Sequence, residues 1–316
     1  MSAAITTPPA APTASRLERL RQQLLARADS LPTVAALVIF VLMLAYGEFA
    51  YGKVFQLSTI SNLFINNAHL IILAVALTFV IISGGIDLSV GAIIALSSVI
   101  GVILANAGWN AWLVILVMIL IGALIGLLSG VLIQYFNVQP FIATLAMMFL
   151  GRGLASMLST VPVRLEEGSG ILLLGTKIKI IDGPKVNDLV ITPGVLIALL
   201  VVVAAFVVLH RTRTGRTVYA IGGSEQSASL MGLAVVRTKL FIYVVSGTLS
   251  GIAAVVYTAR LGSAQNITGI GWELDAIAAA VIGGTLLTGG FGYVLGSVVG
   301  ALVLGQIGRA SCRERV

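Results

Sequence analysis

The stretch FVIISGGIDLSVGAII, residues 79–94, decides the fold of this protein. Gly84, Gly85 and Asp87 interrupt a run of Val, Ile and Leu that resumes at once. The apolar sequence from 63 to 106 is far too long for one helix across a hydrocarbon core about 30 Å thick, which needs roughly 20 residues. The chain must therefore turn at the glycines, and Asp87 can accept hydrogen bonds from the free N–H groups that open the next helix.

The composition of the chain is that of a membrane protein. Of its 316 residues, 58% are hydrophobic and only 10% are charged, and the mean hydropathy is +1.07. Soluble domains, by contrast, are about 25% charged. The apolar runs are continuous rather than alternating, which excludes an outer-membrane β-barrel. The net charge of +7 fits basic loops facing the cytoplasm and anionic lipid better than it fits nucleic-acid binding.

Apolar segments of membrane-spanning length recur along the chain and predict an all-α, polytopic transmembrane helix bundle of about nine segments. A cytoplasmic tail at 1–32, with a basic amphipathic helix, precedes a transmembrane domain at 33–307. We expect residues 308–316, GRASCRERV, to be a truncated or non-native end, because they are polar and do not continue the pattern. The predicted spans are 33–50, 63–83, 89–106, 111–135, 140–159, 190–209, 240–259 and a glycine-rich pair at about 276–290 and 292–307.

Two long segments between spans differ in charge and predict the orientation. Residues 210–239 hold five basic residues against Glu225 alone, whereas residues 160–189 hold four basic and four acidic residues. Cytoplasmic loops carry the excess of Lys and Arg. We therefore expect the N-terminus and 210–239 in the cytoplasm, and 160–189 in the periplasm.

Glycines recur at every fourth position in two of the predicted spans, a spacing that places them on one helix face and lets a second helix approach closely. The two series are offset by 170 residues, which suggests a chain built from two related halves. The predicted packing glycines are Gly122, Gly126, Gly130, Gly292, Gly296 and Gly300.

Two interrupted segments are candidates for a gate. In GGIDLSVG, residues 84–91, Asp87 is either a helix cap at the membrane interface or part of a transport path. In GIGWELDAIAAAVIGGTLLTGG, residues 269–290, Glu273 and Asp275 cap a helix or meet an external partner. The glycines that follow predict a packed or broken helix near the membrane centre, where broken helices commonly line a cavity. The gate candidates are Gly84, Gly85, Asp87, Gly283 and Gly284.

The basic loop RTRTGRTVYAIGGSEQSASLMGL, residues 211–233, contains a short helix of its own. Its chain breaks at Gly222 and Gly223, Ser224 offers an N-cap, Glu225 lies in the first turn, and Gly232 ends the helix. A helix of about two turns is not stable alone and needs a partner surface. It either lies in a groove of a soluble subunit or rests at the membrane interface.

Several kinds of chemistry are excluded. Cys312 is the only cysteine, and His69 and His210 are far apart without grouped carboxylates, so we predict no disulfide and no metal site. The chain has no phosphate-binding loop and no nucleophile elbow, so we predict no catalytic residue and no cofactor in this chain. If ATP drives the protein, another chain must bind it. Arg152, inside the span 140–159, must face protein or water, or else extend to the interface.

Four stretches together identify a family resemblance. They are ILAVALTFVIISGGIDLSVG, NVQPFIATLAMMFLGRG, GRTVYAIGGSEQSASLMGL and GIGWELDAIAAAVIGGTLLTGGFG, and the match runs from about residue 60 to 307. They resemble the permease subunits of bacterial ABC importers for monosaccharides, in the ribose, xylose, arabinose and galactose branch. Within this branch the chain is most similar to a galactofuranose importer permease.

The resemblance implies a transport subunit of the inner membrane, not an enzyme, that moves a monosaccharide into the cytoplasm by alternating access. Its partners would be an ATPase that holds ATP and Mg, a periplasmic sugar-binding protein, and a second permease, identical or different. The tail 308–316 departs from the family, which has a further apolar segment there. The ATPase-coupling segment of the family maps onto Gly222, Gly223, Ser224, Glu225, Ala228, Leu230 and Gly232.

Two other functions fit the sequence less well than an importer permease. A transporter driven by protons or sodium should carry paired charges within the membrane, and this chain offers only Asp87 and Arg152, well apart. An intramembrane enzyme should carry clustered nucleophiles and bases, which the sequence lacks. The residues that contact the substrate are not identified by the sequence. Sparse polar residues within the spans suit an uncharged substrate: Asn66, Asn67, Ser83, Gln139 and Thr144.

Overall fold

The structure is a computed structural model that describes residues 31–52, 55–181 and 188–313. The predicted amphipathic helix of the tail lies outside the described residues. Within them, six helices are long and apolar enough to cross a membrane, and two shorter apolar helices accompany them. The helices are α2 (Leu31–Tyr51), α3 (Leu57–Ile82), α4 (Val90–Asn106), α5 (Ala111–Tyr135), α6 (Pro140–Leu158), α7 (Pro193–Arg211), α8 (Arg213–Gly223), α9 (Glu225–Leu230), α10 (Val235–Leu261), α11 (Trp272–Ile282) and α12 (Val294–Arg313).

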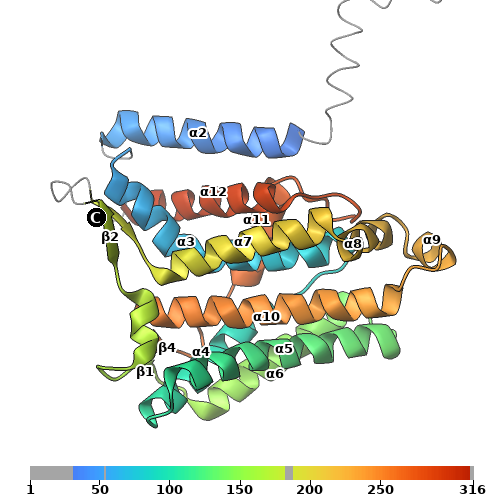
Figure 1. Ribbon diagram of the computed structural model, residues 1–316, viewed down its shortest axis with the longest axis horizontal. Coiled ribbons are helices and arrows are strands. Elements are labelled where there is room, and N and C mark those ends of the chain that lie inside the picture. The colour runs from blue at the N-terminus through green and yellow to red at the C-terminus, as the bar shows by residue number, and fades with distance from the viewer. Residues whose placement is uncertain (1–30, 53–54, 182–187, 314–316) are drawn as a thin grey trace, which may run out of the picture.

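Short strands gather at one end of the bundle, and α8 and α9 lie at the other (Figure 1). We call these the β end and the α9 end. At the β end, β1 (Val163–Arg164) pairs antiparallel with β4 (Ser263–Ala264), and β2 (Ile178–Ile181) pairs antiparallel with β3 (Leu189–Ile191). A 3₁₀ helix, η2 (Gly170–Gly175), lies between β1 and β2.

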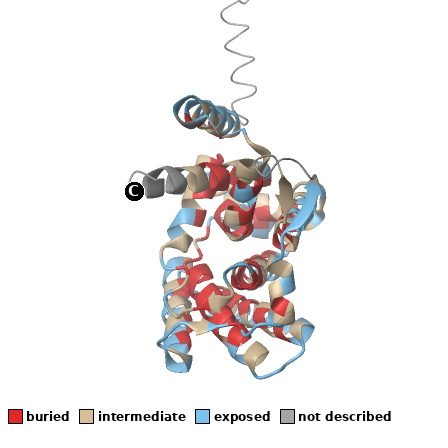
Figure 2. Cartoon of the chain, turned by 90° about the vertical axis from the view of Figure 1, so that its left-hand side faces the viewer, coloured by how far each residue is buried: buried red, intermediate tan, exposed pale blue. Residues whose placement is uncertain are grey.

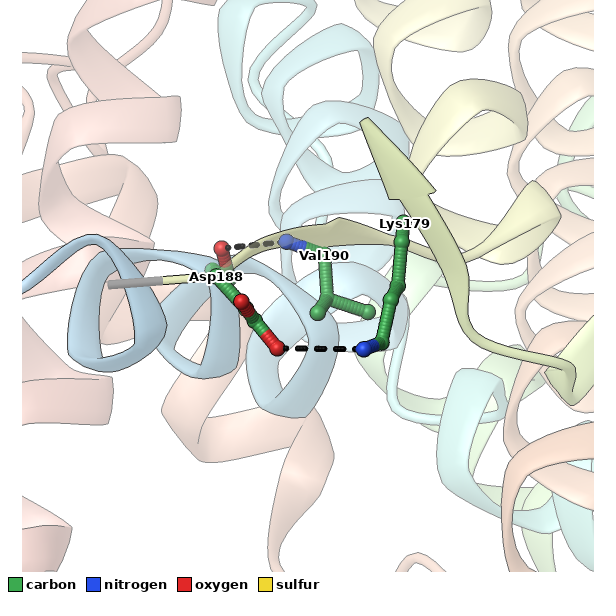
Figure 3. Close-up of polar contacts among 4 residues, drawn as sticks. Lys179, Asp188 and Val190 are labelled. Carbon is green, nitrogen blue, oxygen red and sulfur yellow. Dashed lines mark hydrogen bonds and ion pairs between the residues drawn. The ribbon is translucent and has the colours of Figure 1, made fainter. Parts of the chain in front are cut away.

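The β2–β3 hairpin is fastened in two ways. Lys179 Nζ lies 3.3 Å from Asp188 Oδ2 across the hairpin (Figure 3). The N–H of Val190 donates to Ser61 Oγ at 3.2 Å, which ties the hairpin to the first turns of α3. The segment between α6 and α7 is therefore attached to the helical bundle.

The core is built around α3. In the most apolar stretch of α3, 89% of the residues are buried, whereas in that of α2 only 11% are buried. Buried residues concentrate along the centre of the molecule, and α2 stands on its outside (Figure 2). Large apolar side chains remain exposed along α2, α5, α6 and α7. In a membrane protein such surfaces face lipid or another spanning subunit.

The predicted glycine series lie in close helix contacts, but with different partners. On α5, a Cβ added at Gly122 would collide with the carbonyl oxygen of Gly247 on α10. On α12, a Cβ added at Gly296 would collide with the carbonyl oxygen of Gly283 at the end of α11. Gly292 lies in the loop before α12 and instead faces the side chains of Thr285, in the same loop, and Ile82, at the end of α3. The two series thus serve different helix pairs, and the suggested relationship between two halves stays a prediction.

Several predicted boundaries were wrong. The span expected at 276–290 is shorter and begins earlier, as α11, because Gly271 takes a left-handed conformation immediately before Trp272 and the helix stops at Gly283. Residues 283–293 are not helical. The last helix, α12, continues to Arg313 rather than ending at 307. Most of the cytoplasmic loop expected at 210–239 is helical, because α7 ends at Arg211 and α10 begins at Val235.

Candidate functional site

Three segments with paired glycines meet near the α9 end. Gly84 follows α3, Gly222 lies near the end of α8, and Gly290 lies in the loop before α12. The N–H of Gly290 donates to the carbonyl of Ile82 at 2.8 Å. A Cβ added at Gly222 would collide with that same carbonyl oxygen and with the amide nitrogen of Gly290. We call Ile82, Gly84, Gly222, Gly289 and Gly290 the glycine junction.

The glycine junction is made by backbone atoms. A Cβ added at Gly289 would lie 2.9 Å from the amide nitrogen of Gly84 and 3.0 Å from the carbonyl oxygen of Gly222. Gly84 has φ +79°, a left-handed conformation that glycine adopts readily and that ends α3. No flexible side chain separates the three segments, so the end of α8 packs directly on the end of α3 and on the loop before α12.

A second contact joins α8 to the same loop. Tyr219 Oη donates to the carbonyl oxygen of Gly292 at 2.6 Å. Burial, with a smaller contribution from nearby Tyr293, raises the pKa of Tyr219 to about 12. The hydroxyl therefore keeps its proton and donates throughout the physiological pH range. α8 is thus held to the loop by this side chain as well as by the glycine junction.

One face of the short helix α9 packs against neighbouring parts of the same chain, and its other face is exposed. Ser224 caps it by accepting a hydrogen bond from the N–H of Ser227 at 3.2 Å. Ala228 is fully buried against Ile221 and Val235. Gly232, with φ +75°, lies in the turn that follows the helix.

The exposed residues of α9 are mostly polar, but two large apolar side chains lie at its C-terminal end. The side chain of Leu230 is 84% exposed and that of Met231 is 68% exposed. Lys239 on α10 lies 2.6 Å from Glu225, which fixes the first turn of α9 to the next helix. The C-terminal end of α9 and the residue after it therefore present two large apolar side chains from a fixed position, as a docking surface would.

Asp87 lies inside the bundle and not at a surface. It is fully buried in the non-helical segment between α3 and α4. Its Oδ1 accepts from the N–H of Ser89 at 2.9 Å and from Ser89 Oγ at 2.6 Å. Its Oδ2 accepts from Ser246 Oγ on α10 at 2.7 Å. Asp87 thus accepts from Ser89, the residue that precedes α4, as a cap would, and its place at the membrane interface or in a transport path stays a prediction.

The remaining gate candidates lie in separate places. A Cβ added at Gly85 would lie 2.5 Å from the hydroxyl of Tyr243 on α10. Gly283 packs on the backbone of α12, and its carbonyl accepts from Thr33 Oγ1 of α2 at 3.1 Å. Gly284 follows it with φ +97°. The structure therefore brings Gly84 and Gly222 together in the glycine junction but places Gly283 between α2 and α12.

Arg152 binds protein rather than lipid. Its Nη1 donates to the backbone carbonyls of Asn266, at 2.9 Å, and Thr268, both in the loop before α11. Glu273, in the first turn of α11, accepts from the N–H of Gly271 through Oε1 at 3.2 Å. Glu273 therefore contacts the residue that precedes its own helix, and whether it also meets an external partner stays open.

The sequence did not point to several residues that the structure places in these contacts. Gly289 and Gly290 could have been found from the sequence, because they form a glycine pair beside a predicted span. No sequence feature singles out Tyr219, Ser246 or Ile82. No group of three His, Cys, Asp or Glu side chains that could hold a metal occurs among the described residues.

Known proteins resemble this chain over most of its length. A family model described as "Branched-chain amino acid transport system / permease component" matches residues 59–311. The chain is 56% identical over 274 residues to the fructose import permease protein FruG of Bifidobacterium longum (strain NCC 2705), which covers 86% of this chain and 81% of that protein.

Two further relatives are more distant. The chain is 44% identical over 236 residues to the ribose import permease protein RbsC of Bacillus subtilis (strain 168), covering 75% of this chain and 71% of that protein. It is 37% identical over 279 residues to the inner membrane ABC transporter permease protein YjfF of Escherichia coli (strain K12), covering 88% and 83%. No solved structure matches the chain significantly.

Proposed function

This chain belongs to the family described as the permease component of branched-chain amino acid transport systems, and we propose that it is the membrane-spanning subunit of an ATP-driven importer for a monosaccharide. Members of this family are permease subunits and not enzymes. The family and the apolar spans indicate a multi-pass protein of the inner membrane. The proposal extends this assignment to the substrate, the partners and the direction of transport.

The relatives support a sugar as the substrate. The family description names branched-chain amino acids. The relatives whose names include a substrate are, however, named for fructose, ribose or allose. Fructose is the first candidate, because the fructose permease shares 56% of aligned residues and the ribose permeases share 44% or fewer. Galactofuranose, suggested by the sequence motifs, is the second sugar to test.

We place the α9 end in the cytoplasm. The segment 210–239 carries five basic residues and one acidic residue, and the positive-inside rule assigns such a segment to the cytoplasm. The β end then faces the periplasm, where a sugar-binding protein would deliver its ligand. Proteolysis in sealed right-side-out vesicles tests this orientation, because cleavage within 210–239 without membrane rupture would overturn it.

The observation that carries the proposal is the docking surface of α9 next to the glycine junction. We propose that an ATPase subunit, which would hold ATP and Mg, binds Leu230 and Met231. Its movement on ATP binding would displace α9 and α8 together. The glycine junction would pass this displacement to α3 and to the loop before α12, and the two ends of the bundle would open alternately.

The remaining partners follow from the same scheme. Several helices have exposed apolar faces that are long enough to span a membrane. These faces leave room for a second permease, identical or different, and for lipid around both. Reconstitution tests the whole proposal. Liposomes that contain this chain, its ATPase and its sugar-binding protein should accumulate labelled fructose only with ATP on the ATPase side. Uptake driven by an ion gradient without ATP would instead favour a secondary transporter.

A further inference from the structure

A cavity of about 270 Å³ opens near the β end, where the end of α10, the loop 262–271 and the start of α11 meet. Its lining includes Tyr257, Ser263, Gln265, Thr268 and Trp272. None of the residues that line it is charged. A larger cavity of about 370 Å³ between α3, α7 and α12 differs from it in being lined only by apolar residues.

Three aromatic rings form one side of this region and fix one another. The ring of His69 lies 4.4 Å from the ring of Trp272 and 5.1 Å from that of Tyr257, measured between centroids. The rings of Tyr257 and Trp272 meet edge to face at 4.7 Å. Aromatic rings offer a flat apolar surface, and the C–H faces of sugar rings are apolar. Mutual contact keeps Tyr257 and Trp272 in place before any ligand arrives.

Most of the other lining residues belong to the loop 262–271, which contacts with the rest of the protein hold in place. Arg152 donates to the carbonyls of Asn266 and Thr268, and Asn266 Nδ2 donates to Ser156 Oγ at 3.1 Å. β4, at the beginning of the same segment, pairs with β1. Binding to such a fixed loop loses little conformational freedom.

The arginines nearest the cavity are committed to the protein, and Glu273, beside Trp272, accepts from the N–H of Gly271 through Oε1 while its Oε2 is buried without a partner. Arg152 donates to the loop carbonyls, and Arg260 donates through Nη1 to the carbonyl of Asn66 at 2.9 Å. An amino acid would bring a buried ammonium and a buried carboxylate, which need charged partners. Hydroxyl groups need only the hydroxyl, amide and backbone groups that Ser263, Gln265 and Thr268 supply. The cavity therefore suits a neutral polar molecule.

We propose that this cavity is a transient binding site for one uncharged monosaccharide on its path from the β end. The site rests on the proposed function and adds to it the place and the chemistry of recognition. Its volume lies just below the range of about 300–1,000 Å³ that is typical for drug-sized ligands, which leaves room for one sugar ring. Gln265 and Thr268 bind hydroxyl groups, and Trp272 packs on the ring.

A fluorescence experiment tests binding. The permease–ATPase complex in nanodiscs, with Trp109→Phe and Trp112→Phe, keeps Trp272 as the only tryptophan of this chain. Millimolar D-fructose should change its emission in a saturable manner, whereas leucine and sucrose should not. The complex that carries Trp272→Phe and keeps Trp109 and Trp112 should give no response. An equal response to leucine, or no response to fructose, overturns the proposal.

A transport experiment tests whether the site lies on the path. Gln265→Ala should lower the maximal rate of fructose uptake at least threefold, while the concentration of loaded binding protein at half-maximal rate stays unchanged. Gln56→Ala, at the same end but outside the cavity, should transport at the wild-type rate. ATP hydrolysis stimulated by the binding protein must persist in both variants, which shows that they are folded and assembled.

The two proposals fail differently. If the wild-type complex imports fructose but Gln265→Ala imports it at the same rate, the site is wrong and the function stands. If the wild-type complex imports no monosaccharide, the proposed function itself is wrong. A fluorescence response without an effect on uptake would place the cavity off the path and would also overturn the proposal.

Discussion

Asp87 Oδ2 accepts a hydrogen bond of 2.7 Å from Ser246 Oγ, a residue 159 positions further along the chain. This contact joins the non-helical segment between α3 and α4 to a residue in the middle of α10. Together with the two hydrogen bonds from Ser89, it uses both oxygens of a fully buried carboxylate. A buried carboxylate that is fully hydrogen-bonded holds local structure strongly, because each of its partners would otherwise be buried without one.

Replacing Asp87 by alanine should destabilise the protein more than replacing it by asparagine. Asp87→Ala leaves the N–H of Ser89 and the hydroxyl of Ser246 buried without partners, and each such group costs about 1–3 kcal/mol. Asp87→Asn keeps one acceptor for Ser89, and its amide can donate to Ser246. Thermal unfolding in detergent measures the difference, and equal melting temperatures for the two variants would show that these hydrogen bonds do not hold the segment.

Two neighbouring glycines at the end of α8 should respond differently to alanine. In Gly222→Ala, the methyl group would collide with backbone atoms of Ile82 and Gly290, which cannot move independently. An added Cβ at Gly223 has nothing within 4 Å. We expect Gly222→Ala to reduce ATP-driven uptake at least tenfold and Gly223→Ala to leave it within about twofold. Uptake in proteoliposomes decides this, and a tolerated Gly222→Ala would mean that the glycine junction is not a fixed contact.

The contact between α5 and α10 provides a similar comparison for stability. A methyl group at Gly122 would overlap the carbonyl of Gly247, and overpacking of this kind costs about 1–3 kcal/mol. Gly153, exposed on α6, has free space around it, and alanine there gains up to about 1 kcal/mol of helix propensity. Melting temperatures should therefore fall for Gly122→Ala and stay level or rise for Gly153→Ala. A fall for both would point to a general intolerance of alanine.

The exposed face of α9 should determine ATPase binding without affecting the fold. Leu230→Ser and Met231→Ser remove apolar surface that faces outward, so the isolated chain should melt as the wild type does. Co-purification of the ATPase should drop at least fivefold, because large exposed side chains at the centre of an interface carry most of its binding energy. Ala228→Asp is the contrasting variant, since it buries a charge against Ile221 and Val235 and should lower stability itself.

Removing the hydroxyl of Tyr219 should loosen α8 by a small amount. Tyr219→Phe loses the hydrogen bond to Gly292, which contributes on the order of 1 kcal/mol. The pKa of Tyr219 rises from 10.0 to about 12 in the folded protein, so its contribution is complete below pH 10 and is lost as the pH rises through about 12. Melting curves of wild type and Tyr219→Phe should therefore converge between pH 10 and 12, and a constant difference would contradict this.

The long spans could be predicted because length and hydropathy alone require them. The run from 63 to 106 exceeds one crossing, and the structure breaks it between Ile82 and Val90. The start of α11 was misjudged because a left-handed glycine, Gly271, sets it before the apolar run begins. Helix α8 was missed for a related reason, since only Gly215, Val218 and Ile221 on one face of a basic segment are buried.

The candidate sites could be predicted only where a residue type was unusual in its sequence context. Asp87 was found because a carboxylate within an apolar run is unusual, but its partner Ser246 is an ordinary residue of a long helix. The glycine junction depends on backbone atoms of Ile82, which carry no signal in the sequence. The polar cavity depends on the folding of a loop against Arg152, a contact that spans more than a hundred residues.

The exposed side chains of α9 take no part in the packing that holds the helix. Ala228, Ser224 and Glu225 fix its position, whereas Leu230 and Met231 only cover its outer surface. Substitutions at these two positions would therefore change what the proposed docking surface recognises without disturbing the contacts that hold α9 in place.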